Sequence, residues 1–416
     1  MLSDPCDGIQ TNVTQASLKR DVGLLLFAAY GIGNIIGAGI YVLIGKVAGE
    51  AGYLAPFAFF LAAFIAVFTG LSYGELSARF PVSAGEAVYL HKAFNRRTLS
   101  MAVGLLIAAA GLVSAATMTL GFVGYFQVLF NLPDWVIIIT IVIALTVVAS
   151  RGIVESASVA ALLTVIEVGG LVWIIAVAAP NVTLSAPIFD EQMVPVSSLA
   201  WQGVLGGAFL AFFAFIGFED MVNIAEEVKY PERNLPLGIL IAFTVSTVLY
   251  LLVAIVSIAT VSPHDLAASD APFADVYTAA TGKSPAIIST IGLFAVVNGA
   301  LIQIIMGARI FYGMSVNGWI PKLFSYVSPH TSAPTLATAT AGAIVIFLAL
   351  WLPLVGLARA TSFMVLVVFV LINLSLIRIK LRDPAPAGIR LMPIWVPAIG
   401  MSASAAIIIT SIFISR

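Results

Sequence analysis

Long apolar stretches alternate with short polar segments along the whole chain. A stretch of about 20 apolar residues is long enough to cross a bilayer as a helix, which satisfies its own backbone hydrogen bonds in hydrocarbon. The pattern therefore predicts an all-α polytopic membrane protein. It has about eleven spans, at 22–45, 54–77, 98–128, 134–150, 158–179, 200–227, 236–261, 285–313, 334–352, 357–378 and 393–414.

The composition supports lipid as the solvent for most of this surface. Hydrophobic residues make up 61% of the chain and charged residues 9%, whereas a soluble domain carries about a quarter charged residues. A formal net charge of −1 gives no basic surface for nucleic acid. Cys6 is the one cysteine, which excludes a disulfide framework within the chain and a metal cluster of several thiolates. We expect no metal and no cofactor.

The basic residues predict the orientation, because cytoplasmic segments are enriched in Lys and Arg. With a cytoplasmic N-terminus, only Lys46, Lys283, Arg359 and Arg416 of the 19 basic residues lie outside. Residues 1–20 are then a cytoplasmic segment, the C-terminus is external, and the protein lies in the inner or plasma membrane. The external segment 262–284 is expected to fold as a short lid helix.

Two spans are interrupted by glycine. The first carries four glycines within Gly31–Gly39, and the sixth carries four within Gly203–Gly217. Each glycine weakens a helix by about 1 kcal/mol relative to alanine. Close helix packing would explain the first set alone. Interrupted helices at corresponding places in two five-helix halves instead predict an inverted repeat, with a binding site where the breaks meet.

Several segments resemble the amino acid–polyamine–organocation transporters, in the right order over about residues 18–380. The resemblance rests on Gly37-Ala38-Gly39-Ile40, Tyr73-Gly74-Glu75-Leu76 and Phe215-Ile216-Gly217-Phe218-Glu219, with Arg309, Gly318 and Pro321 further on. It implies the leucine-transporter-like fold of five plus five helices, with helices 1 and 6 broken, working by alternating access. The first repeat is then 21–180 and the second 200–380, and 391–416 adds an eleventh helix.

The resemblance also implies a substrate site. The carboxylate is bound by helix 1 amides at Ala38 and Gly39, with Ile35 and Gly37 adjacent. The ammonium group is bound by helix 6 carbonyls. The carbonyls are those of Phe213, Ala214 and Ile216. Phe218 and, more loosely aligned, Ser114 or Thr117 are implied for the side-chain pocket.

Four residues are candidates for coupling or gating, namely Glu167, Glu219 and, more loosely aligned, Asn298 and Gln303. Several proton-linked members carry a lysine in helix 5 where this chain has Glu167. A charge inside an apolar helix costs at least about 2.5–3.5 kcal/mol, so burial favours the protonated form. Glu167 can exchange a proton during transport, tie helix 5 to helix 1 or 8 by hydrogen bonds, or bind sodium. Glu219, just past the helix 6 break, can organise a gate by pairing with backbone donors.

These patterns favour a secondary active transporter of neutral or small apolar amino acids, coupled to protons rather than sodium or working by exchange. Polyamines or cationic amino acids are the alternative if Glu219 or Glu167 faces the cavity. A channel, a non-transporting sensor and a membrane enzyme are less well supported. The expected partners are a small amino acid or amine and the lipid bilayer, with the oligomeric state left open.

Overall fold

The computed structural model describes residues 21–414 apart from 82–84, 152–155, 184–196, 317, 319, 329–332, 385–388 and 390. The predicted cytoplasmic segment 1–20 lies outside these residues. Within the described ranges every regular element is a helix, and a single isolated bridge joins Val22 to Val228. The all-α prediction is confirmed.

A helix lies at each of the eleven predicted spans. By length and composition, eight helical stretches of the described residues can cross a membrane, and the apolar helices Leu24–Gly37, Asp134–Ser150 and Thr335–Trp351 are shorter. The elements at the predicted spans are α1 (Leu24–Ala51), α2 (Ala55–Arg79), α4 (Arg97–Leu129), α5 (Asp134–Ser150), α6 (Ser156–Ala178), α8 (Ser198–Ala211), α9 (Pro231–Thr260), α12 (Ala286–Val316), α13 (Thr335–Trp351), α14 (Leu354–Arg382) and α15 (Trp395–Ile414).

Short helices complete the connections. The segment α3 (Gly85–Phe94) follows α2, and the expected lid is two helices, α10 (Pro263–Ala268) and α11 (Pro272–Thr281). Each begins with proline at its first position, where the missing N–H has no helical partner to lose. The Lys46 ammonium on α1 donates to the carbonyls of Ala267 and Ser269 at 2.8 and 2.9 Å, so the lid is tied to α1.

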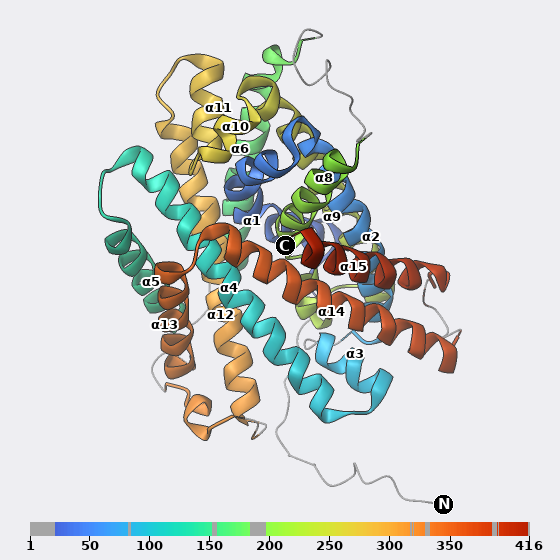
Figure 1. The fold of residues 1–416 in the computed structure, drawn as a ribbon. Coiled ribbons are helices and arrows are strands. Elements are labelled where there is room, and N and C mark those ends of the chain that lie inside the picture. The colour runs from blue at the N-terminus through green and yellow to red at the C-terminus, as the bar shows by residue number, and fades with distance from the viewer. Residues whose placement is uncertain are drawn as a thin grey trace, which may run out of the picture.

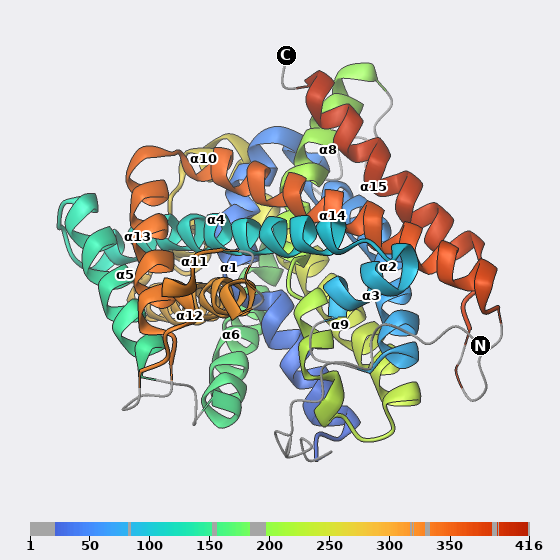
Figure 2. The same ribbon diagram turned by 90° about the horizontal axis from the view of Figure 1, so that it is seen from below.

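The helices form a central group flanked by peripheral pairs. Figures 1 and 2 show α5 with α13 at one edge of the molecule and α15 at the opposite edge. Of the central elements, α1 and α2 contact each other and both contact α8 and α9, and the long helices α4 and α12 pack together beside them. The division into two repeats remains a prediction, although helices at equivalent places in the two halves, such as α4 and α12 or α5 and α13, pack together.

Candidate functional site

The first break lies within α1, at Gly37. Its backbone angles, φ −16° and ψ −151°, are not helical, although the residues on both sides are. The amides that open a helix segment have no intrahelical acceptor, so the backbone from Ala38 and Gly39 onward offers donors beside the break. This is the interruption that the glycine pattern predicted.

The second break follows α8. The chain passes through the 3₁₀ turn η3 (Phe212–Phe215), an extended Ile216 and then Gly217, before the 3₁₀ helix η4 (Glu219–Glu227). Gly217 has φ +126°, a conformation that side chains with a Cβ rarely adopt. The sixth span is therefore broken, as predicted.

The two breaks are in contact. A Cβ added at Gly217 would lie 2.4 Å from the carbonyl oxygen of Asn34 on α1, and one added at Gly39 would lie 2.6 Å from the Cα of Ala214. Glycine is thus required at both points for the backbones to approach so closely.

Tyr250, on α9, connects the breaks from behind. Its buried hydroxyl lies 2.6 Å from the Ile35 carbonyl oxygen and 2.8 Å from that of Ala214. Since the hydroxyl has one proton, it donates to one of these carbonyls at a time. A lone tyrosine in an apolar helix carries no sequence signal for such a role, and the sequence interpretation missed it.

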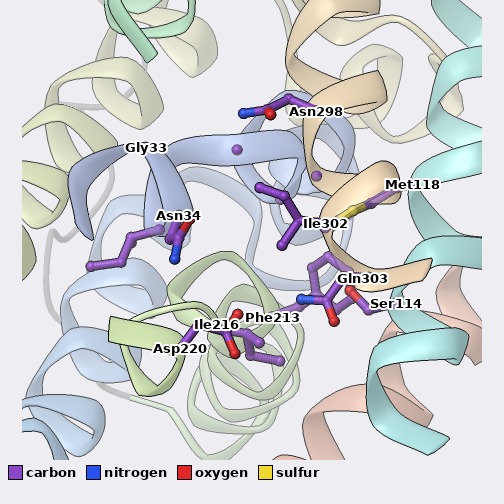
Figure 3. A pocket seen from close by; sticks show the side chains of 14 residues that line it. Gly33, Asn34, Ser114, Met118, Phe213, Ile216, Asp220, Asn298, Ile302 and Gln303 are labelled. Atoms are coloured by element: carbon purple, nitrogen blue, oxygen red, sulfur yellow. The ribbon is translucent and has the colours of Figure 1, made fainter. Parts of the chain in front are cut away.

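A cavity of about 450 Å³ lies where the breaks meet. Figure 3 shows Asn34 of α1, Asp220 of η4 and Gln303 of α12 around it. Eight predicted site residues are among its lining residues, which are Gly33, Asn34, Ile35, Gly37, Gly39, Ser114, Met118, Phe213, Ile216, Asp220, Asn298, Gly299, Ile302 and Gln303.

Other predicted residues lie outside this lining. The Ala214 carbonyl accepts from Tyr250. Phe218 is buried in an aromatic cluster with Tyr73 and Phe369, at ring separations of 5.7 and 5.2 Å. The buried Thr117 hydroxyl donates to its own helix. The backbone of Ala38 follows the break, and its side chain is outside the described part of the structure.

Glu167 lies behind the cavity. It is fully buried on α6, and its Oε1 accepts from the Asn298 side-chain amide at 3.1 Å. Its Oε2 is buried without a hydrogen-bond partner among the described residues. The Glu167 backbone carbonyl accepts from the Tyr41 hydroxyl at 2.6 Å, so this turn of α6 is bonded to both α1 and α12. Since Asn298 lines the cavity, one side chain separates Glu167 from it.

A second cavity of about 410 Å³ adjoins the first and shares Ser114, Ile216, Asp220 and Gln303 with it. Glu219 lines the second cavity, and its Oε2 accepts from the Gly217 amide at 2.8 Å, across the break. The sequence interpretation did not include Asp220 as a site residue. The signal was available, because Asp220 is a carboxylate next to a predicted break.

Glu86 was also missed. It lines the second cavity from α3, and its carboxylate accepts from the Tyr73 hydroxyl at 3.3 Å. Desolvation raises the pKa of Glu86 to about 7, and the Tyr73 hydrogen bond partly opposes this shift. Glu86 lies between two predicted spans, where a carboxylate is usually a solvated interfacial charge.

Comparisons with known proteins agree with this architecture. The model of the amino acid permease family matches residues 22–416. The branched-chain amino acid permease of Bacillus subtilis (strain 168) is 30% identical over 404 residues, which are 91% of this chain and 84% of that protein.

Two plant relatives are longer than this chain. The vacuolar cationic amino acid transporter 4 of Arabidopsis thaliana is 29% identical over 394 residues, which are 90% of this chain and 65% of the relative. The chloroplastic cationic amino acid transporter 9 of the same plant is 31% identical over 337 residues, which are 75% and 58%. Because the family model covers nearly the whole chain, this multi-pass membrane protein belongs to the amino acid permease family.

Proposed function

We propose that this amino acid transporter binds the zwitterionic head of its substrate where the two breaks meet and moves it by alternating access. The observation that carries the proposal is that both breaks line one cavity and touch each other at Gly217 and Gly39. The N-terminal end of a half-helix favours a carboxylate. Backbone carbonyls of the second break suit an ammonium group.

The walls of the first cavity favour small apolar side chains. Met118, Phe213, Ile216 and Ile302 line it together with four glycines of α1 and α12. An apolar side chain gains free energy by leaving water for such a surface. A neutral substrate of this kind is consistent with the sequence similarity to the branched-chain amino acid permease of Bacillus subtilis.

Glu167 is proposed as the proton-carrying group. A protonated carboxyl can donate from the Oε2 that has no partner, whereas the ionised form only accepts. Gain or loss of the proton therefore changes the bonding between α6 and α12 through Asn298. A ligand or proton shifts a conformational equilibrium only by its differential affinity for the two states, and this contact supplies such a difference.

Uptake of a labelled branched-chain amino acid into proteoliposomes tests the proposal. A carrier shows saturable uptake and counterflow. Net uptake should be driven further by an inward proton gradient and should be indifferent to a sodium gradient. Flux that never saturates would indicate a channel, and binding without flux would indicate a sensor.

The Glu167→Gln variant tests the coupling. It keeps a hydrogen-bonding side chain but cannot ionise, so uptake should lose its pH dependence while counterflow remains measurable. Glu232→Gln is the matched control, because Glu232 is an exposed glutamate. A Glu167→Gln protein whose uptake keeps the wild-type pH profile would remove Glu167 from the mechanism.

The orientation is part of the proposal. With the N-terminus in the cytoplasm, Cys6 is the one thiol of the chain and lies on the inner side. A membrane-impermeant thiol reagent should therefore label inside-out vesicles and leave right-side-out vesicles unlabelled. Labelling of right-side-out vesicles would reverse the orientation.

A further inference from the structure

The second cavity collects acidic side chains and no basic ones. Glu86 reaches it from α3, and Glu219 and Asp220 reach it from η4. The surfaces from α4 and α14 are apolar apart from Ser114 and Thr361, and α12 contributes Gln303 and Met306. No lysine, arginine or histidine is among the lining residues in the described part of the chain.

These carboxyl groups are nine-tenths buried or more, with exposed fractions of 8% for Glu86, 9% for Glu219 and 6% for Asp220. Burying a carboxylate is costly unless it meets a cation, a proton or sufficient donors. Glu86 has the Tyr73 hydroxyl and Glu219 has the Gly217 amide. Neutral donors of this kind do not replace a positive charge.

A separate observation points to an occupant. Ser114 is 1% exposed, and its buried Oγ has no hydrogen-bond partner among the residues described. It lines both cavities, and Figure 3 shows Ser114 beside Gln303 on the wall that the two cavities share. A buried hydroxyl without a partner is uncommon in native proteins and calls for an explanation.

We propose that the second cavity is a subsite for the positively charged end of a substrate side chain, an ammonium or guanidinium group. This deepens the proposed function and rests on it. A long cationic amino acid would leave its zwitterionic head at the breaks and extend past Ser114 and Gln303 toward Asp220, Glu219 and Glu86. Short apolar side chains would remain in the first cavity.

Guanidinium and ammonium groups both match the hydrogen-bond acceptors of the second cavity. A guanidinium group offers five N–H donors in a planar fork and forms paired, charge-assisted hydrogen bonds to carboxylates. An ammonium group offers three donors. Either one would supply the missing positive charge, and both have donors available for carboxylate and hydroxyl oxygens such as Ser114 Oγ.

Protons compete for the same carboxylates. The pKa of Glu86 is raised to about 7 by burial, so Glu86 is increasingly ionised as the pH rises through neutrality. The titratable groups around it are Tyr73 of α2, Tyr89 of its own helix, and Glu219 and Asp220 of η4. The α4, α12 and α14 walls of the cavity add none. Cation binding should therefore strengthen from pH 6 to pH 8.

The decisive comparison uses a charged and an uncharged side chain of the same shape. Arginine and citrulline have nearly equal length, but only arginine carries a positive charge. Each would compete against uptake of a labelled branched-chain amino acid into proteoliposomes. We expect arginine to inhibit at about tenfold lower concentration than citrulline at pH 7.5. The ratio of the inhibitory concentration of citrulline to that of arginine should fall severalfold at pH 6. The ratio cancels effects of pH on coupling that both compounds share.

Two variants test whether Glu86 is the source of the preference for arginine over citrulline. Glu86→Gln should bring the arginine-to-citrulline ratio toward one, whereas the exposed Glu232→Gln should retain it. Equal inhibition by arginine and citrulline in the wild type, or an unaltered ratio in Glu86→Gln, would overturn the subsite. If Glu86→Gln does not fold, the comparison of arginine with citrulline in the wild type, and its pH dependence, still test the subsite. Neutral uptake without arginine preference refutes only the subsite, whereas absence of transport for every amino acid refutes the proposed function.

Discussion

Gly217 lies at the closest approach between the two broken helices, so a single methyl group at this residue perturbs the candidate site directly. The Gly217→Ala change places a Cβ 2.4 Å from the Asn34 carbonyl oxygen and 2.8 Å from its carbon. The obstructing atoms belong to backbone and cannot rotate away. Either α1 and the second break separate, or the backbone at residue 217 abandons its φ of +126°.

The cost has two parts. Holding a residue with a Cβ in a sparsely populated backbone region costs of order 1–3 kcal/mol, and forcing an extra methyl into a packed region typically costs about 1–3 kcal/mol. Together they give about 2–6 kcal/mol. Since about 1.4 kcal/mol is a tenfold change in an equilibrium constant, substrate affinity should fall by more than tenfold if the breaks move apart.

Substitutions at two other glycines separate the cost of the backbone strain from the cost of the steric clash. Gly282 has φ +67° with open space around its Cβ position, so Gly282→Ala carries the backbone strain without the clash. Gly104 has open space and no positive φ, so Gly104→Ala carries neither. The measurements are uptake into proteoliposomes and the rise in melting temperature on adding substrate, since a ligand that binds only the folded form stabilises it.

We expect Gly217→Ala to lose both uptake and the substrate-induced thermal shift, with Gly282→Ala mildly destabilised and Gly104→Ala close to wild type. If Gly217→Ala transported and bound as well as Gly282→Ala, the contact between the breaks would not determine the site. The reasoning from the geometry of the two breaks would then be refuted.

Two further substitutions test the supports of the site. Tyr250→Phe removes the hydroxyl at both breaks and should lower stability by about 1–3 kcal/mol and reduce the substrate-induced thermal shift; an unchanged shift would contradict this. Glu75 is fully buried and accepts from Lys380 at both of its oxygens and from Arg79 at Oε1, so Glu75→Gln should destabilise the protein by about 3–5 kcal/mol. Adding Lys380→Met should restore part of this stability in the same melting assay, because it removes one of the two buried cations that pair with Glu75. A double variant no better than Glu75→Gln would argue against this reasoning.

The spans and their breaks were predictable because both are local properties of the chain. Apolar length alone marks a helix in lipid, and glycine clusters mark the places where helices 1 and 6 are weak. Boundaries moved where a local cap overrode hydropathy. The seventh span begins at Pro231 instead of residue 236, because Tyr230, with φ +49°, ends the preceding segment and proline starts the helix.

The residues that complete the site were not predictable in the same way. Tyr250 is 215 positions from Ile35 and 36 from Ala214 along the chain, so only the packed fold brings its hydroxyl to both carbonyls. Glu86 reaches the cavity because α3 packs against α4 and α14, which no periodicity indicates. Phe218, in contrast, follows the motif of helix 6 but contacts Tyr73 and Phe369.

Breaking a helix in lipid exposes backbone groups that cost several kcal/mol each when unpaired. In this chain some of them are paired within the protein, since Tyr250 donates to the Ile35 or the Ala214 carbonyl and the Gly217 amide donates to Glu219. A zwitterion held at the breaks would pair others that face the cavity, and it would do so fully only while α1 and the second break are together. The contacts that bind the substrate are then the same contacts that hold the two breaks together. Changes that separate the breaks must weaken affinity and transport in parallel, whereas Glu167→Gln, which leaves the breaks in place, must uncouple protons without abolishing exchange.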